Sequence, residues 1–168
     1  MDRDKYIKTV TAISENEKLA KSVRYANSVL TVSVYVFYPL YLFYLVFFKR
    51  EVLAVTITVP FISFVVISVI RAVLNSPRPY ELYKIKPVIN KETRGKSFPS
   101  RHVFSAFVIG TTVLYSNIIL GIIVFAVGIL IGFIRVIAGV HFIRDVLCGA
   151  LFGIVFGTVG LAVYNFYF

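Results

Sequence analysis

The sequence has few charged residues, and this shortage is its first informative feature. Only 15% of the 168 residues are charged, whereas 58% are hydrophobic and the mean hydropathy is +0.84. About a quarter of the residues in an ordinary soluble domain are charged. A chain this apolar could not cover its own surface with polar groups. The composition therefore excludes a disordered chain and favours a membrane protein over a soluble one.

Cysteine and acidic residues are also scarce. The single Cys148 excludes an internal disulfide and a metal site built from several cysteines. The eight acidic residues and two histidines form no acidic pair or Cys/His set with metal-ligand spacing, so we expect no metal and no other cofactor. No short basic segment leads into an apolar run with an Ala-x-Ala-like site, so we expect no cleaved signal peptide.

Long apolar runs define the expected fold, because a helix needs about 20 residues to cross a bilayer. Residues 103–115 qualify only if their helix extends back through Pro99. Residues 1–28 mix charged and apolar residues, which is typical of an amphipathic helix at the membrane interface or of a solvated helix. We expect one domain over residues 1–168, an all-α bundle of about five transmembrane helices. The five expected spans are 29–48, 52–70, 103–115, 118–134 and 146–168.

The net charge of +10 suggests an anionic partner. In a membrane chain, this favours lipid and phosphate over nucleic acid. If residues 1–28 do not cross the membrane, two polar segments, 71–101 and 135–145, lie on the same membrane face. The first segment contains eight basic and two acidic residues, and the two segments hold both histidines of the chain. We expect these segments to form the active site.

Arginine and helix-start residues in these segments point to phosphate chemistry. The guanidinium group matches phosphate oxygens and keeps its charge, and ionisable groups at membrane helix ends often mark function. Ser97 or Ser100 is placed to cap the third span, with Pro99 in its first turn. The amides of that helix start would then face an anion. Four arginines converge here: Arg71, Arg78, Arg101 and Arg135.

The two histidines are the expected reactive groups of this phosphate chemistry. His141 and Asp145 are four residues apart and share one helix face if the last span begins there. A carboxylate that holds one imidazole nitrogen makes the other more basic, which suits a histidine nucleophile. His102 is then available to protonate a leaving oxygen. Both histidines could instead be structural, but their shared context favours the catalytic interpretation.

The three clusters Arg71-x6-Arg78-Pro79, Pro99-Ser100-Arg101-His102 and Arg135-x5-His141-x3-Asp145 resemble the signature of the type 2 phosphatidic acid phosphatase family. The resemblance implies a metal-independent membrane lipid phosphatase that shares its core fold with vanadium haloperoxidases. It implies that His141 forms a phosphohistidine, that Asp145 orients it, and that His102 protonates the leaving group and then activates water. It also implies a set of phosphate-binding residues: Arg71, Arg78, Ser100 and Arg135.

Three positions depart from the family pattern. Arg71 replaces the usual lysine and keeps its charge. Arg101 replaces the usual glycine, where it either crowds the site or binds a second phosphate. Ile134 replaces the serine before Arg135, which removes one phosphate hydrogen bond. These changes leave the substrate open among a polyprenyl diphosphate such as undecaprenyl diphosphate, phosphatidic acid and phosphatidylglycerol phosphate.

Two other functions fit the same residues: a lipid phosphotransferase, and a non-enzymatic phosphate-lipid binding or transport protein. The positive-inside count favours a cytoplasmic site, whereas the resemblance to bacterial lipid-recycling phosphatases favours the outer face of the plasma membrane, which we expect. A stripe of small residues in the last span predicts close helix packing, within the chain or in a homodimer. The stripe consists of Gly149, Gly153, Gly157 and Gly160.

Overall fold

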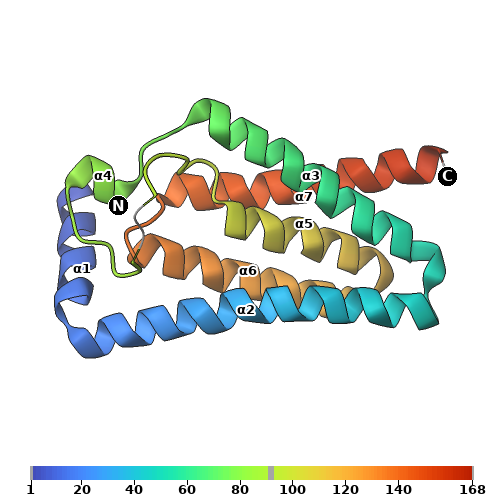
Figure 1. The fold of residues 1–168 in the computed structure, drawn as a ribbon, viewed down its shortest axis with the longest axis horizontal. Helices are drawn as coiled ribbons and strands as arrows, with labels where there is room; N and C mark the ends of the chain where they lie inside the picture. The colour runs from blue at the N-terminus through green and yellow to red at the C-terminus, as the bar shows by residue number, and fades with distance from the viewer. Residues whose placement is uncertain (1, 91–92, 168) are drawn as a thin grey trace.

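The computed structural model describes residues 2–90 and 93–167, and these residues form helices and connecting loops without a β-strand. The long helices run along the longest axis of the molecule, and the shorter N-terminal helix lies across one end of them (Figure 1). The expected all-α bundle is confirmed. The helices are α1 (Arg3–Glu15), α2 (Glu17–Phe48), α3 (Leu53–Leu74), α4 (Pro79–Tyr83), α5 (Arg101–Ser116), α6 (Ile118–Ile137) and α7 (Ile143–Tyr167), with a 3-10 turn η1 (Arg50–Val52) before α3.

The helix α5 forms the centre of the bundle. It packs against α3, α6 and α7, and ten of its sixteen residues are buried. Its length of about 24 Å is short for a membrane span. Among the described residues, four helical segments are long and apolar enough to cross a membrane, and they include α2, α3, α6 and α7. These four helices surround α5 and expose large apolar side chains on their outer faces, as a lipid-facing surface requires.

The glycine stripe of α7 packs against other helices of the same chain. A Cβ atom on Gly153 would lie 2.6 Å from the Cβ of Phe107 and 2.8 Å from the carbonyl oxygen of Phe104. Gly149 and Gly157 face α5 in the same way, and Gly160 faces α3. The small residues let α7 approach α5 at backbone distance. The stripe therefore serves packing inside one chain.

The N-terminal segment is divided differently from the expectation of one interfacial helix over residues 1–28. The helix α1 ends at Glu15, and the side chain of Asn16 accepts a hydrogen bond from the Leu19 amide at 3.1 Å to begin α2. Residues 17–28 are thus the first turns of a long helix. This separation leaves α1 lying across the end of the bundle (Figure 1). Its buried residues Tyr6 and Val10 pack there against Val88, Ala138 and Val140.

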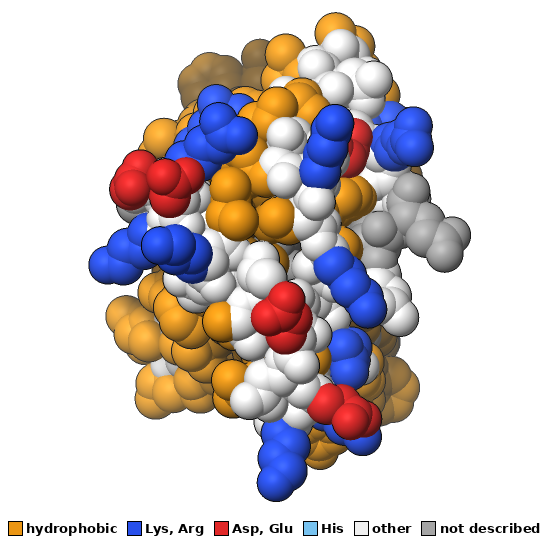
Figure 2. Space-filling view, turned by 90° about the vertical axis from the view of Figure 1, so that its left-hand side faces the viewer, with side chains coloured by type: hydrophobic (Ala, Val, Ile, Leu, Met, Phe, Trp, Pro, Cys, Tyr) orange, Lys and Arg blue, Asp and Glu red, His pale blue; other side chains and the backbone are white. Residues whose placement is uncertain are grey.

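The two polar segments meet at this end, as the count of spans predicted. The Val88 amide donates to the Ala138 carbonyl at 3.0 Å and joins the α4–α5 loop to the α6–α7 turn. Figure 2 looks onto this end, where Lys and Arg side chains are spread over the surface with fewer Asp and Glu side chains among them. The two polar segments thus share one face of the molecule, and the η1 turn lies at the other end.

Candidate active site

A cavity of about 380 Å³ opens among the three polar clusters. It lies between the C-terminal end of α3, the loop before α5, the start of α5 and the turn before α7. Both histidines line it, together with the guanidinium groups of four arginines. Its walls consist of Ser68, Arg71, Arg78, Thr93, Arg94, Gly95, Lys96, Arg101, His102 and His141.

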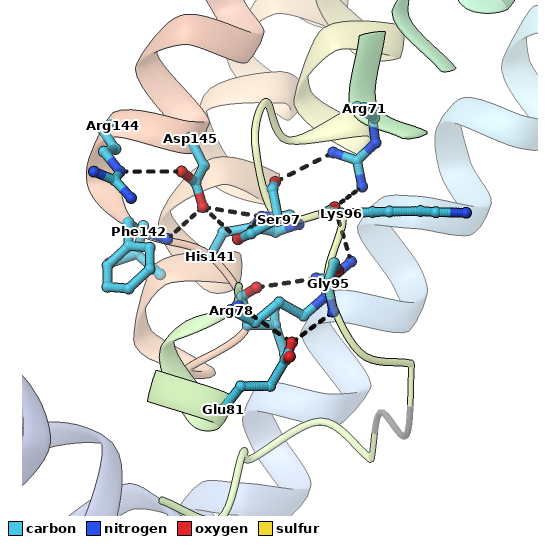
Figure 3. A network of polar contacts seen from close by, with 12 residues as sticks. Arg71, Arg78, Glu81, Gly95, Lys96, Ser97, His141, Phe142, Arg144 and Asp145 are labelled. Carbon is cyan, nitrogen blue, oxygen red and sulfur yellow. Dashed lines mark hydrogen bonds and ion pairs between the residues drawn. The ribbon is translucent and has the colours of Figure 1, made fainter. Parts of the chain in front are cut away.

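His141 is held with one ring nitrogen toward a carboxylate. It lies in the turn just before α7, and only 1% of its surface is exposed. Its Nδ1 lies 3.6 Å from Asp145 Oδ2 and 3.4 Å from Ser97 Oγ (Figure 3). Burial penalises the imidazolium ion and lowers the pKa of His141 to about 4, although the Asp145 carboxylate acts in the opposite direction. The ring is therefore neutral near pH 7, as a nucleophile must be.

Asp145 is itself fixed by three groups. Its Oδ2 accepts hydrogen bonds from Ser97 Oγ at 2.5 Å and from the Phe142 amide at 3.0 Å. Its Oδ1 lies 3.6 Å from Arg144 Nε. The carboxylate is fully buried, and the two bonds to Oδ2 compensate in part for its removal from water, whereas Oδ1 has no hydrogen-bond partner within the described residues. The predicted His141–Asp145 pair is thus formed, and Ser97, which the sequence suggested only as a helix cap, completes it.

Arg71 and Arg78 use many of their donors on the protein backbone. Arg71 Nη1 donates to the Ser97 carbonyl at 3.2 Å, and Nη2 donates to the Lys96 carbonyl. Arg78 Nε donates to the Gly95 carbonyl at 3.0 Å, and its Nη2 donates to Lys96 at 3.3 Å. Both guanidinium groups therefore hold residues 95–97 against the cavity, in addition to lining it (Figure 3).

Glu81 is a second residue that the sequence did not single out. Its Oε1 accepts from the Gly95 amide at 2.8 Å and from the Arg78 amide at 3.2 Å. Gly95 has a φ of +67°, a conformation that glycine adopts without strain. Arg78 Nη1 also donates to the Val140 carbonyl at 3.0 Å, next to His141. These bonds connect α4, the loop and the catalytic turn.

Ser100 and Arg135 contain buried polar atoms that need a partner. Within the described residues, neither Ser100 Oγ nor Arg135 Nε has a hydrogen-bond partner. Buried polar atoms of this kind are rare and call for an explanation. Neither residue is on the cavity wall. Arg135 is nevertheless joined to His141, because its carbonyl accepts a hydrogen bond from the His141 amide at 3.3 Å.

The predicted cap of the third span is wrong in detail. Ser100 is the residue before α5, but its hydroxyl makes no capping bond, and Pro99 precedes the helix. The Ser100 amide instead donates to the Asp145 carbonyl at 2.8 Å. This bond joins the start of α5 to the first turn of α7. The Ser100 hydroxyl itself has no hydrogen-bond partner within the described residues.

Arg101 and His102 begin α5, and both line the cavity. The Arg101 guanidinium carbon lies 5.4 Å from the centre of the Phe64 ring on α3, within cation–π distance. His102 is partly exposed and shares the cavity with His141. The structure thus brings five of the eight predicted site residues to the cavity wall, and Asp145, Ser100 and Arg135 lie buried outside it.

Comparison with solved structures identifies the same fold elsewhere. LpxE of Aquifex aeolicus is 29% identical and superposes with a TM-score of 0.72 over 92% of this chain and 93% of its own. The transmembrane PAP2-type phosphatidylglycerolphosphate phosphatase of Bacillus subtilis is 20% identical, with a TM-score of 0.70 over 99% and 86% of the two chains. No curated protein matches the chain. The model of the PAP2 superfamily matches residues 53–168, a range that begins at α3 and includes α7 and the turn that holds His141. The chain therefore belongs to this superfamily of phosphatases.

Proposed function

We propose that this protein is a metal-independent lipid phosphatase that works through a phosphohistidine at His141. The supporting observation is one cavity at the polar end of a membrane bundle that holds His141, His102 and five basic side chains. No Asp or Glu is among the described residues of its wall. Such a cavity favours a dianionic phosphate group at the level of a lipid headgroup.

Each ring nitrogen of His141 has its own role in the proposed mechanism. Because Nδ1 faces Asp145 and Ser97, Nε2 is the nitrogen available to the substrate. Attack of Nε2 on phosphorus forms a P–N bond and breaks the P–O bond to the lipid. His102 protonates the departing oxygen and then takes a proton from the water that hydrolyses the phosphohistidine. The products are free phosphate and the dephosphorylated lipid.

Arginine side chains take the place of a metal ion in this mechanism. Arg71 and Arg78 face the cavity with their charges already oriented by backbone carbonyls. Preorganised cations stabilise the charge that develops on the phosphoryl oxygens without reorientation during the reaction. Ser100 Oγ and Arg135 Nε also lack a hydrogen-bond partner within the described residues, but neither residue lines the cavity, so a bond from either one to the phosphate requires its side chain to move.

The test is phosphate release by the purified full chain in detergent with excess EDTA. Undecaprenyl diphosphate, phosphatidic acid and phosphatidylglycerol phosphate are offered in parallel, with His141→Ala as the inactive control. We expect release that survives EDTA and falls at least about 10³-fold in the variant, since removal of a nucleophile leaves only residual catalysis. Loss of release in EDTA, or its persistence in His141→Ala, contradicts the mechanism.

Two other outcomes identify a different activity. Transfer of phosphate to an added alcohol or lipid, without free phosphate, identifies a phosphotransferase. Binding of the lipids without any phosphate release, unchanged by His141→Ala, identifies a binding or transport protein. Either result contradicts the proposed hydrolase.

A further inference from the structure

Arg101 differs from the other arginines of the cavity in how its donors are used. Arg71 and Arg78 donate to the backbone carbonyls of residues 95–97. Arg101 makes no hydrogen bond within the described residues, and its contact is the Phe64 ring at 5.4 Å. Its guanidinium group is exposed on the cavity wall. The guanidinium group of Arg101 is therefore placed over the Phe64 ring, with its donors available to a ligand.

The charge of the cavity exceeds what one phosphate group requires. Five cationic side chains line it: Arg71, Arg78, Arg94, Lys96 and Arg101. A phosphate monoester carries a charge of about −1.5 to −2 near pH 7. The remaining positive charges repel one another unless a second anionic group lies among them.

The neighbouring groove shows on which side that second group lies. An apolar groove of about 350 Å³ runs between α2, α3 and α5, and its lining includes Ser105 and Phe64, the ring that Arg101 contacts. Arg101 therefore lines the cavity that holds His141 and contacts Phe64, a residue of the groove wall. A lipid that enters the cavity from the groove along Phe64, with its terminal phosphate at His141, passes Arg101.

We propose that Arg101 binds the inner phosphate of a lipid diphosphate, and that this class of lipid is the preferred substrate. The inference rests on the proposed phosphatase function. The terminal phosphorus then lies at His141, the inner phosphate lies at Arg101, and the apolar chain follows Phe64 into the groove. His141 Nε2 bonds to the terminal phosphorus, and the bond from that phosphorus to the bridging oxygen breaks. The leaving group is the lipid monophosphate, whose bridging oxygen takes the proton from His102, and water then releases free phosphate.

The test compares farnesyl diphosphate with farnesyl monophosphate, which share one apolar chain. Phosphate release from each is measured for the wild type, Arg101→Gln and Arg101→Lys. Lys86→Gln is the matched control. Lys86 is an exposed basic residue of the loop between α4 and α5, and it does not line the cavity. Binding of both lipids to His141→Ala, with and without Arg101→Gln, is measured by thermal shift as a readout that needs no turnover.

We expect Arg101→Gln to lower kcat/KM for the diphosphate by roughly 10- to 100-fold, the effect of one lost charge-assisted hydrogen bond. The monophosphate should change by less than about threefold, Arg101→Lys should retain most of the preference, and Lys86→Gln should behave as wild type. Equal losses on both lipids, or no loss on either, overturn the inference and leave the phosphatase function intact. Absence of release by the wild type overturns the proposed function. In that case, diphosphate binding that is weakened selectively by Arg101→Gln in the His141→Ala protein still supports the subsite, and unselective binding overturns it.

Discussion

Ser97 holds the carboxylate that faces His141, the nucleophile of the proposed mechanism. Its hydroxyl lies 2.5 Å from Asp145 Oδ2 and 3.4 Å from His141 Nδ1. Partners that orient a functional imidazole affect turnover more than substrate affinity, because they fix the ring and do not touch the ligand.

We therefore expect Ser97→Ala to lower kcat by about 10- to 100-fold with little change in KM. Steady-state kinetics in detergent measures both constants, and Ser97→Thr, which keeps the hydroxyl group, should recover part of the activity. A raised KM with an unchanged kcat would place Ser97 on the substrate instead of behind His141.

Burial of neutral His141 links folding stability to pH. The unfolded imidazole takes up a proton as the pH falls through its ordinary pKa of 6.5, whereas the folded protein does so only near pH 4. The unfolded state binds more protons between these values, so stability is full above pH 6.5 and is lost as the pH falls toward 4.

We expect the Tm of the detergent-solubilised protein to fall more steeply between about pH 7 and pH 4.5 in the wild type than in His141→Asn. Thermal unfolding at several pH values measures the two slopes. Parallel curves would show that the proton uptake belongs to other groups.

At the scale of elements, α1 is more than a membrane-surface helix. The Tyr6 hydroxyl donates to the carbonyl oxygens of Val136 at 3.2 Å and His141 at 3.4 Å. Its ring stacks on Phe142 with 6.5 Å between centroids, and burial raises the pKa of Tyr6, so that its hydroxyl stays protonated. The helix α1 thus supports the turn that carries His141, the proposed nucleophile.

We expect Tyr6→Phe to lower kcat by about three- to tenfold, since one net hydrogen bond is worth about 1 kcal/mol, and to leave the Tm nearly unchanged because the ring packing remains. Tyr25→Phe, which changes an exposed tyrosine of α2, is the matched control. An unaltered kcat would mean that α1 only packs against the bundle and does not support the turn that holds His141.

The contact between α5 and α7 should be the most sensitive to added volume. A methyl group on Gly153 would lie 2.8 Å from a backbone carbonyl oxygen that cannot move aside. Gly153→Ala should therefore destabilise the bundle by about 1–3 kcal/mol, the usual range for overpacking.

Thermal unfolding of Gly153→Ala in detergent measures this loss, with the exposed α7 position Leu151→Ala as the control. A Tm equal to that of the control would mean that α7 is not held at backbone distance from α5.

At the scale of the whole molecule, all active-site segments lie at the end opposite η1 (Figure 1), and we propose that this end faces outward from the plasma membrane. On a Cys148→Ala background, Lys86→Cys should react with a membrane-impermeant maleimide in intact cells. Glu51→Cys, in η1 at the other end, should react only after permeabilisation. The reverse pattern would place the site in the cytoplasm.

The sequence by itself determined the class of fold and predicted the candidate reactive residues. Long apolar runs require membrane helices, because a bilayer admits few other structures. The spacing of His141 and Asp145 predicted their pairing, because residues four apart meet near a helix start. Counting the spans then placed His102 and His141 on one face, and the structure puts both on one cavity.

Only the tertiary structure decided which other residues support that pair. Ser97 lies 48 positions from Asp145, and Tyr6 lies 135 positions from His141. No periodicity links such distant positions, because their contact depends on how α1, α5 and α7 pack together. The same reason explains why the predicted helix cap at Ser100 is wrong, although Ser100 directly precedes a helix. Its amide bonds to the Asp145 carbonyl across the bundle, and its hydroxyl is left without a partner among the described residues.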